Sequence, residues 1–208
     1  MRQPSDNSTY IDLKAMTRIR IELVDVYCRD TEDVTGADEF YILGGVGSYS
    51  KLGATGDDLK IRPVLTVPIK INDKQRKPFG KGGGIIFDDD VPENNTLYIA
   101  LAGYDEDANK DWSKHGEMVT KVGSAISAGL KAVPYPPAQI TGTILPLAIA
   151  GVGLAMMLDK DDELGQLKRD LPVSAISSGS HAQFWTLRKK GGWYSSWDYT
   201  VTYRIHKG

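Results

Sequence analysis

The chain has 208 residues, of which 41% are hydrophobic and 25% charged, the composition of an ordinary globular protein. These proportions exclude a wholly disordered or collagen-like chain, and the single cysteine, Cys28, excludes an internal disulfide framework. The formal net charge of −2 gives no global attraction for nucleic acid, so we predict no nucleic-acid partner.

The N-terminal half is predicted to alternate strands with polar loops. Its first dozen or so residues are polar and lack the apolar stretch of a secretory signal. In residues 18–28, Ile19, Ile21 and Leu23 alternate with charged side chains, which is typical of a half-buried strand. Further strands are predicted over residues 39–47, 61–71, 84–87 and 96–104, with DDDVPENN read as a turn. Pro63 and Pro68 favour an edge strand or a bulge.

The C-terminal end is predicted to form a hairpin. Two alternating segments, 182–190 and 193–206, flank Gly191 and Gly192, a turn signal between strands. With the strands above, this makes about seven or eight short strands, which predicts an antiparallel β-sandwich. Tryptophans and cations also gather here, and they indicate either a basic aromatic surface for sugar, lipid or nucleic acid, or hairpin side chains that fill the core. These residues are Trp185, Trp193, Trp197, Arg188, Lys189 and Lys190.

The middle of the chain departs from the strand pattern. Residues 111–131 place apolar side chains at helical spacing, and residues 138–158 form a second apolar segment that contains Pro146. No charge occurs between Ala132 and Leu158, a stretch about as long as the roughly 20 apolar residues that span a bilayer. Two interpretations stay open. The segment inserts into lipid, or a helical hairpin packs its apolar faces on the sandwich or on each other.

Two thirds of the 27 acidic residues fall in three windows, 25–39, 88–111 and 159–163, each with a single Lys or Arg. Crowded carboxylates repel one another, and Ca²⁺, which takes about six to eight oxygen ligands from flexible loops, is a common neutraliser. A solvated acidic surface is the alternative. An EF-hand beginning at Asp105 is excluded, because Lys110 and Gly116 occupy the positions that require Gly and Glu.

The acidic segments resemble the calcium loops of a C2 domain, the calcium-binding β-sandwich of membrane-targeting proteins. Residues 33–41, DVTGADEFY, resemble the first calcium loop, although the spacing is one residue shorter and Glu39 replaces the family's Pro. Residues 104–107, YDED, and 162–165, DELG, resemble the opening and the close of the third loop. Residues 111–158 separate these two pieces, so we interpret them as a helical insertion within a single C2-like domain of residues 1–208.

The resemblance implies a non-enzymatic module that binds Ca²⁺ and attaches to an anionic lipid membrane or a protein partner. The matching calcium ligands are Asp33, Asp38, Asp105, Asp107 and Asp162, with Asp30, Asp159 and Asp161 as additional candidates. The compartment is not fixed by the sequence, and an extracellular or membrane-peripheral location is favoured. The alternatives are a membrane-active or toxin-associated protein that inserts residues 138–158, and a metal-using hydrolase. The hydrolase ranks last because the chain has no HExxH or GxSxG motif.

Overall fold

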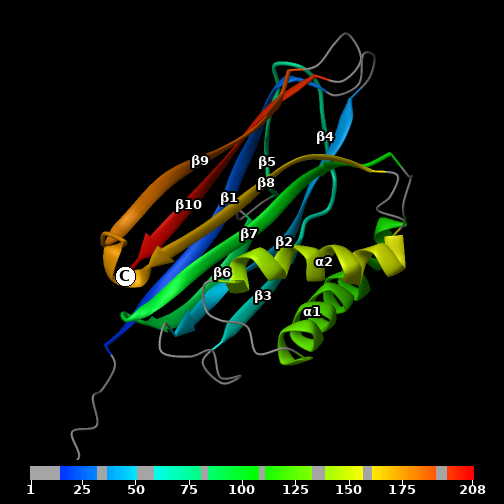
Figure 1. Ribbon diagram of the computed structural model, residues 1–208. Coiled ribbons are helices and arrows are strands. Elements are labelled where there is room, and N and C mark those ends of the chain that lie inside the picture. The colour runs from blue at the N-terminus through cyan, green and yellow to red at the C-terminus, as the bar shows by residue number, and fades with distance from the viewer. Residues whose placement is uncertain are drawn as a thin grey trace, which may run out of the picture.

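The computed structural model describes residues 15–31, 37–50, 59–80, 84–107, 111–132, 139–156, 161–190 and 196–208. These residues form two antiparallel sheets packed face to face, with two helices against the outer face of one of them (Figure 1). The predicted antiparallel β-sandwich is therefore confirmed.

Sheet A has the strand order β5-β1-β10-β9, and β6 also pairs with β1. Its strands are β1 (Met16–Asp30), β5 (Arg76–Pro78), β6 (Gly84–Pro92), β9 (Gly179–Lys189) and β10 (Trp197–Lys207). Along β10, Tyr199, Val201, Tyr203 and Ile205 are buried, whereas the residues between them are partly exposed. One face of sheet A therefore lies on the core and the other faces solvent, as the alternation in the sequence predicts.

Sheet B has the order β3-β2-β7-β8, and β4 also pairs with β2. Its strands are β2 (Asp38–Ser50), β3 (Lys60–Leu65), β4 (Ile69–Ile71), β7 (Asn95–Asp105) and β8 (Asp162–Pro172). Every residue of β7 is buried, because one face of sheet B packs on sheet A and the other on the helices. A strand buried on both faces reads as a continuous apolar run, which explains the sequence of β7.

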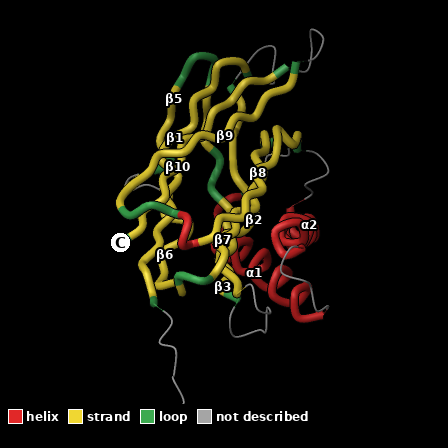
Figure 2. The backbone as a smooth tube through the Cα atoms, turned by 60° about the vertical axis from the view of Figure 1, so that its left-hand side comes forward, coloured by secondary structure: helices red, strands yellow, loops and turns green. Residues whose placement is uncertain are grey.

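The helical segment forms a pair that covers sheet B (Figure 2). A short 3-10 helix, η1 (Trp112–Lys114), leads into α1 (His115–Ala132), and α2 (Ile140–Met156) follows. Helix α1 buries Met118, Val122 and Ile126, and α2 buries Ile144 and Ala148, among others, against the same face of the sheet. The two helices therefore pack on the sandwich and on each other, as the hairpin interpretation predicts. None of the helices in the described part of the chain is long and apolar enough to cross a membrane.

Two local details differ from the sequence-based expectation. The predicted strand 61–71 is interrupted at residues 66–68, before and at Pro68, and its two parts, β3 and β4, pair with β2 at the edge of sheet B. The predicted turn DDDVPENN begins later, because Asp88, Asp89 and Asp90 still belong to β6 and lie opposite residues of β1. A short 3-10 helix, η4 (Val173–Ala175), connects β8 to the turn before β9.

Candidate functional site

The predicted calcium loops belong to one end of the sandwich, which we call the loop end. Here β1, β7 and β9 finish and β2, β8 and β10 begin. In sheet B, Asp105 lies opposite Phe40 on one side and opposite Asp162 on the other. In sheet A, Asp30 lies opposite Asp198. The register therefore brings members of all three acidic windows, Asp30, Asp105 and Asp162, to the same end of the molecule, although their sequence positions are far apart.

Asp38 opens β2 and its side chain lies between the two sheets. It is 1% exposed, and its carboxylate accepts a hydrogen bond from the hydroxyl of Tyr199 in β10 of the opposite sheet. Burial, followed by this carboxylate, raises the pKa of Tyr199 well above its ordinary value. Burial also raises the pKa of the neighbouring Cys28 thiol to about 12. Asp38 is thus part of a buried polar contact that joins the sheets at the loop end.

Asp105 and Asp162 share the face of Asp38. Asp105 is 1% exposed and accepts a hydrogen bond from the backbone N–H of Glu39 at 2.8 Å. Because directly opposed residues of an antiparallel pair point to the same face, Asp105 and Asp162 lie on the side of Phe40, which is the core side. Asp162 is exposed. Three predicted ligands from three neighbouring strands therefore share one face of sheet B.

Asp161 lies on the other face of sheet B, toward the helices. Its Oδ2 accepts a hydrogen bond from the hydroxyl of Tyr41 at 2.6 Å, and its Oδ1 accepts the backbone N–H of Asp107 at 3.3 Å. Tyr41 packs among the residues that meet the helices and stacks on Tyr104 with ring centroids 5.4 Å apart. Burial first, and then Asp161, raises the pKa of Tyr41. The Asp107 and Asp161 pair thus connects the end of β7 with the start of β8.

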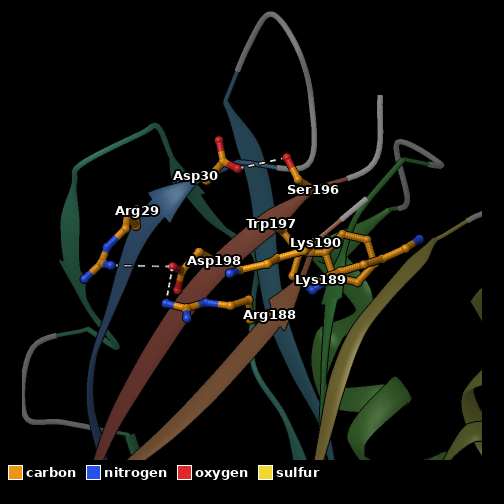
Figure 3. Close-up of a pocket in the computed structure, with 8 residues that line it drawn as sticks. All are labelled: Arg29, Asp30, Arg188, Lys189, Lys190, Ser196, Trp197 and Asp198. Carbon is orange, nitrogen blue, oxygen red and sulfur yellow. Dashed lines mark hydrogen bonds and ion pairs between the residues drawn. The ribbon is translucent and has the colours of Figure 1, made fainter. Parts of the chain in front are cut away.

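The remaining predicted ligands are placed differently. Asp33 and Asp159 lie outside the described residues. Asp30 lies on the sheet A side, where its Oδ2 accepts a hydrogen bond from Ser196 at 2.9 Å beside several cations (Figure 3). The run Asp88–Asp90 belongs to an ion-pair network instead of the loop end. Its partners include Arg18 and Arg20, which lie 2.7 and 2.9 Å from Asp88, and Lys60, which is 2.7 Å from Asp89.

Asp73 is a loop-end carboxylate that the sequence reasoning missed. It lies in the turn between β4 and β5, where its Oδ1 accepts hydrogen bonds from the backbone N–H and the hydroxyl of Thr31 at 2.8 and 2.9 Å. Asp73 is isolated from the three acidic windows, so acid density could not find it. The signal in the sequence was the pair Asn72-Asp73, since these residue types favour turns, and the structure places a tight turn here in which Lys74 has a positive φ of 59°.

These contacts define what the loop end can do chemically. Its carboxylate oxygens are hard donors of the kind that Ca²⁺ prefers. Within the ranges that the structure describes, however, no group of three or more His, Cys, Asp or Glu side chains is arranged so that it could hold a metal ion. The calcium ligand set stays a prediction, and two of its members, Asp33 and Asp159, lie outside the described residues.

No protein-family model and no curated protein sequence matches the chain. Among solved structures, a C2 domain is 13% identical with a TM-score of 0.30, over 92% of this chain and 98% of that one. A C2 domain of a plant extended synaptotagmin 1 is 8% identical with a TM-score of 0.32, over 92% and 93%. Human GIVD cytosolic phospholipase A2 is 9% identical with a TM-score of 0.35, over 93% of this chain.

The chain spans 17% of the length of that phospholipase. Since every one of these TM-scores is below 0.5, the likenesses establish nothing about ligands, and the functional argument rests on the side chains described above.

Proposed function

We propose that this chain is a non-enzymatic binding module in which Ca²⁺ binds at the loop end and controls attachment to an anionic membrane or a protein partner. The observation that carries the proposal is that Asp38, Asp105 and Asp162 begin or end three neighbouring strands and share one face of sheet B. Carboxylates on one face repel one another, and a bound cation removes that repulsion.

Three carboxylates do not complete a calcium shell, which takes about six to eight oxygen atoms. Asp33 and Asp159 are the predicted ligands that would add to them. Asp33 lies in the connection between β1 and β2, and Asp159 lies three residues before Asp162. Asp107 and Asp161 are less suited, since the Asp161 carboxylate already binds Tyr41 and the Asp107 amide on the opposite face. Backbone carbonyls and water would supply the remaining oxygens.

The alternative function, insertion of residues 138–158 into lipid, requires α2 to leave sheet B. Ile140, Ile144 and Leu145 are each at most 1% exposed in their present packing. Taking each of them out of a protein core costs about 1.5–3 kcal/mol, which lipid contact would have to replace. The packing of α2 therefore favours attachment through the loop end over insertion of the helix.

Calorimetric titration of the full chain with Ca²⁺, together with thermal melting in Ca²⁺ and in chelator, tests the proposal. A ligand that binds only the folded state must raise the melting temperature. The D105N variant keeps an oxygen that can accept the Glu39 N–H while it removes the charge, and it should weaken calcium binding about tenfold or more. The control is E117Q, which neutralises an exposed acid on α1 and should bind calcium like the wild type.

Absence of both a heat signal and a melting shift at millimolar Ca²⁺ would refute the calcium site. Where calcium does bind, co-sedimentation with phosphatidylserine vesicles, in calcium and in chelator, separates the two kinds of attachment. Calcium-dependent sedimentation supports a membrane target. Calcium binding without sedimentation leaves the protein partner as the target.

A further inference from the structure

A cavity of about 470 Å³ lies at the loop end on the side of sheet A (Figure 3). It is formed where β1 and β9 finish and β10 begins. Four cationic side chains line it, namely Arg29, Arg188, Lys189 and Lys190. Among the residues that the structure describes, two carboxylates, Asp30 and Asp198, line the same cavity. A locally positive cavity in a chain of net charge −2 is the feature to be explained.

Asp198 fixes the two guanidinium groups. It lies 2.5 Å from Arg188 and 3.8 Å from Arg29, and Figure 3 shows both arginines reaching this one carboxylate. Asp198 is 15% exposed, whereas the Arg29 side chain is 66% exposed. Arginine has five N–H donors in a planar fork, so one carboxylate leaves donors of both arginines available for a second anion.

Unlike the two arginines, the two lysines form no ion pair with a carboxylate of the described residues. The ammonium of Lys189 lies 4.6 Å from the centroid of the Trp197 ring, a cation–π contact that positions the charge without cancelling it. Lys190 is exposed and makes no hydrogen bond or ion pair with any residue that the structure describes. Trp197 itself is 8% exposed and donates its Nε1–H to the carbonyl of Leu164 at 2.7 Å. The indole ring that Lys189 contacts is therefore fixed in the core.

We propose that this cavity binds a phosphomonoester group, carried either by a lipid headgroup or by a soluble phosphorylated compound. A phosphomonoester is close to a dianion at neutral pH and offers three acceptor oxygens, which matches arginine forks and lysine point charges that line one cavity. The volume falls within the range of about 300–1,000 Å³ that is usual for small-molecule sites. An extended polyanion needs a long basic stripe, and these cations form a compact group instead.

Calorimetry and vesicle co-sedimentation of the full chain test this site, with chelator present throughout so that calcium plays no part. The soluble probe is glycerol 3-phosphate. The membrane probe is phosphatidylcholine vesicles containing phosphatidic acid, which carries a phosphomonoester, compared with vesicles containing an equal share of phosphatidylserine, which does not. The test variant R29Q/K190Q removes two exposed cations of the cavity, and K168Q neutralises an exposed lysine on β8 as the matched control.

The expected result is binding of glycerol 3-phosphate, or preference for phosphatidic acid over phosphatidylserine vesicles, that R29Q/K190Q weakens about tenfold or more and K168Q leaves unchanged. Binding of glycerol 3-phosphate identifies a soluble source, and binding of the vesicles alone identifies a headgroup. If neither probe binds, or if R29Q/K190Q binds like the wild type, the proposal is wrong. A K189Q variant gives the same test if R29Q/K190Q does not fold. The calcium proposal would be unaffected by failure here, because these measurements exclude calcium.

Discussion

The contact between α2 and sheet B can be tested through a single pair of residues, Gly45 of β2 and Ile144 of α2. Ile144 is fully buried. A Cβ added at Gly45 would lie 2.8 Å from Ile144 Cγ2, closer than real carbon atoms approach. The next neighbours of that Cβ, Ile126 Cδ1 and the carbonyl oxygen of Arg62, are 3.5 and 3.6 Å away, which is ordinary contact. The missing side chain at Gly45 therefore lets α2 lie close to the sheet.

The magnitudes follow from these distances. Ile144→Ala removes buried methyl and methylene groups and should lower the free energy of unfolding by about 2–5 kcal/mol. Gly45→Ala should lower it by about 1–3 kcal/mol through overpacking, offset by about 0.4–1 kcal/mol because alanine restricts the unfolded chain. The double variant lacks Cγ2 at position 144, so the clash disappears. The double variant should therefore be about 1–2 kcal/mol more stable than the sum of the single effects predicts.

Urea unfolding of the wild type, both single variants and the double variant measures this coupling energy. The matched control pairs Gly45→Ala with Ile126→Ala, whose contact is ordinary and whose coupling should be much smaller. Effects of Gly45→Ala and Ile144→Ala that add within about 0.3–0.5 kcal/mol would refute the packing described above. That outcome would reopen the insertion of residues 138–158 into lipid.

Three further predictions concern the two ends of sheet A. Hydrogen bonds, the strongest from Arg18, lower the pKa of Asp88 below 3.8. The stability this carboxylate contributes is therefore present above its unfolded pKa and is lost as the pH falls through the folded value. Urea unfolding should show that D88N is less stable than the wild type at neutral pH and equal to it in strong acid. The Cys28 thiol, buried and with a pKa of about 12, should react slowly with a disulfide reagent at mildly alkaline pH and rapidly in denaturant, and fast native reaction would contradict this burial. Tyr199→Phe deprives buried Asp38 of a donor and should cost about 1–3 kcal/mol in urea unfolding, while an unchanged midpoint would show that this hydrogen bond is absent in solution.

Much of the fold could be predicted because local pattern and tertiary environment agree. Residues 18–28 and 199–205 alternate, and they lie in β1 and β10, each with one face on the core. Residues 96–104 do not alternate, and they lie in β7 between two buried layers. The apolar character of residues 138–158 had two physical explanations, since a helix buried on a sheet and a helix buried in lipid need similar surfaces. Only the position of α2 on sheet B distinguishes them.

The candidate site was less predictable, because charge neutralisation is decided by residues distant in sequence. Asp88 stands in the same acidic window as Asp105, but its partner Arg18 lies 70 positions away. Pairing of β1 with β6 brings Arg18 and Asp88 together, and nothing local to either residue indicates it. Asp73 shows the opposite case, a carboxylate that has no acidic neighbours in its own turn and yet belongs to the loop end through Thr31.

The loop end also has an electrostatic consequence that neither proposal contains alone. Asp30, which lines the cavity, and Asp38, a predicted calcium ligand, both disfavour ionisation of the Cys28 thiol, so both carboxylates act on one group at this end of the sandwich. A calcium ion held near Asp38 would make the electrostatic potential more positive at the cavity and strengthen binding of a phosphate there. Binding free energies are reciprocal, so a phosphate in the cavity would strengthen calcium binding by the same factor. Salt should weaken this coupling, because charges about 10 Å apart in solvent are largely screened at an ionic strength near 0.1 M. Two oppositely charged sites at the same end of the sandwich would thus be thermodynamically coupled, although the total charge of the chain is close to zero.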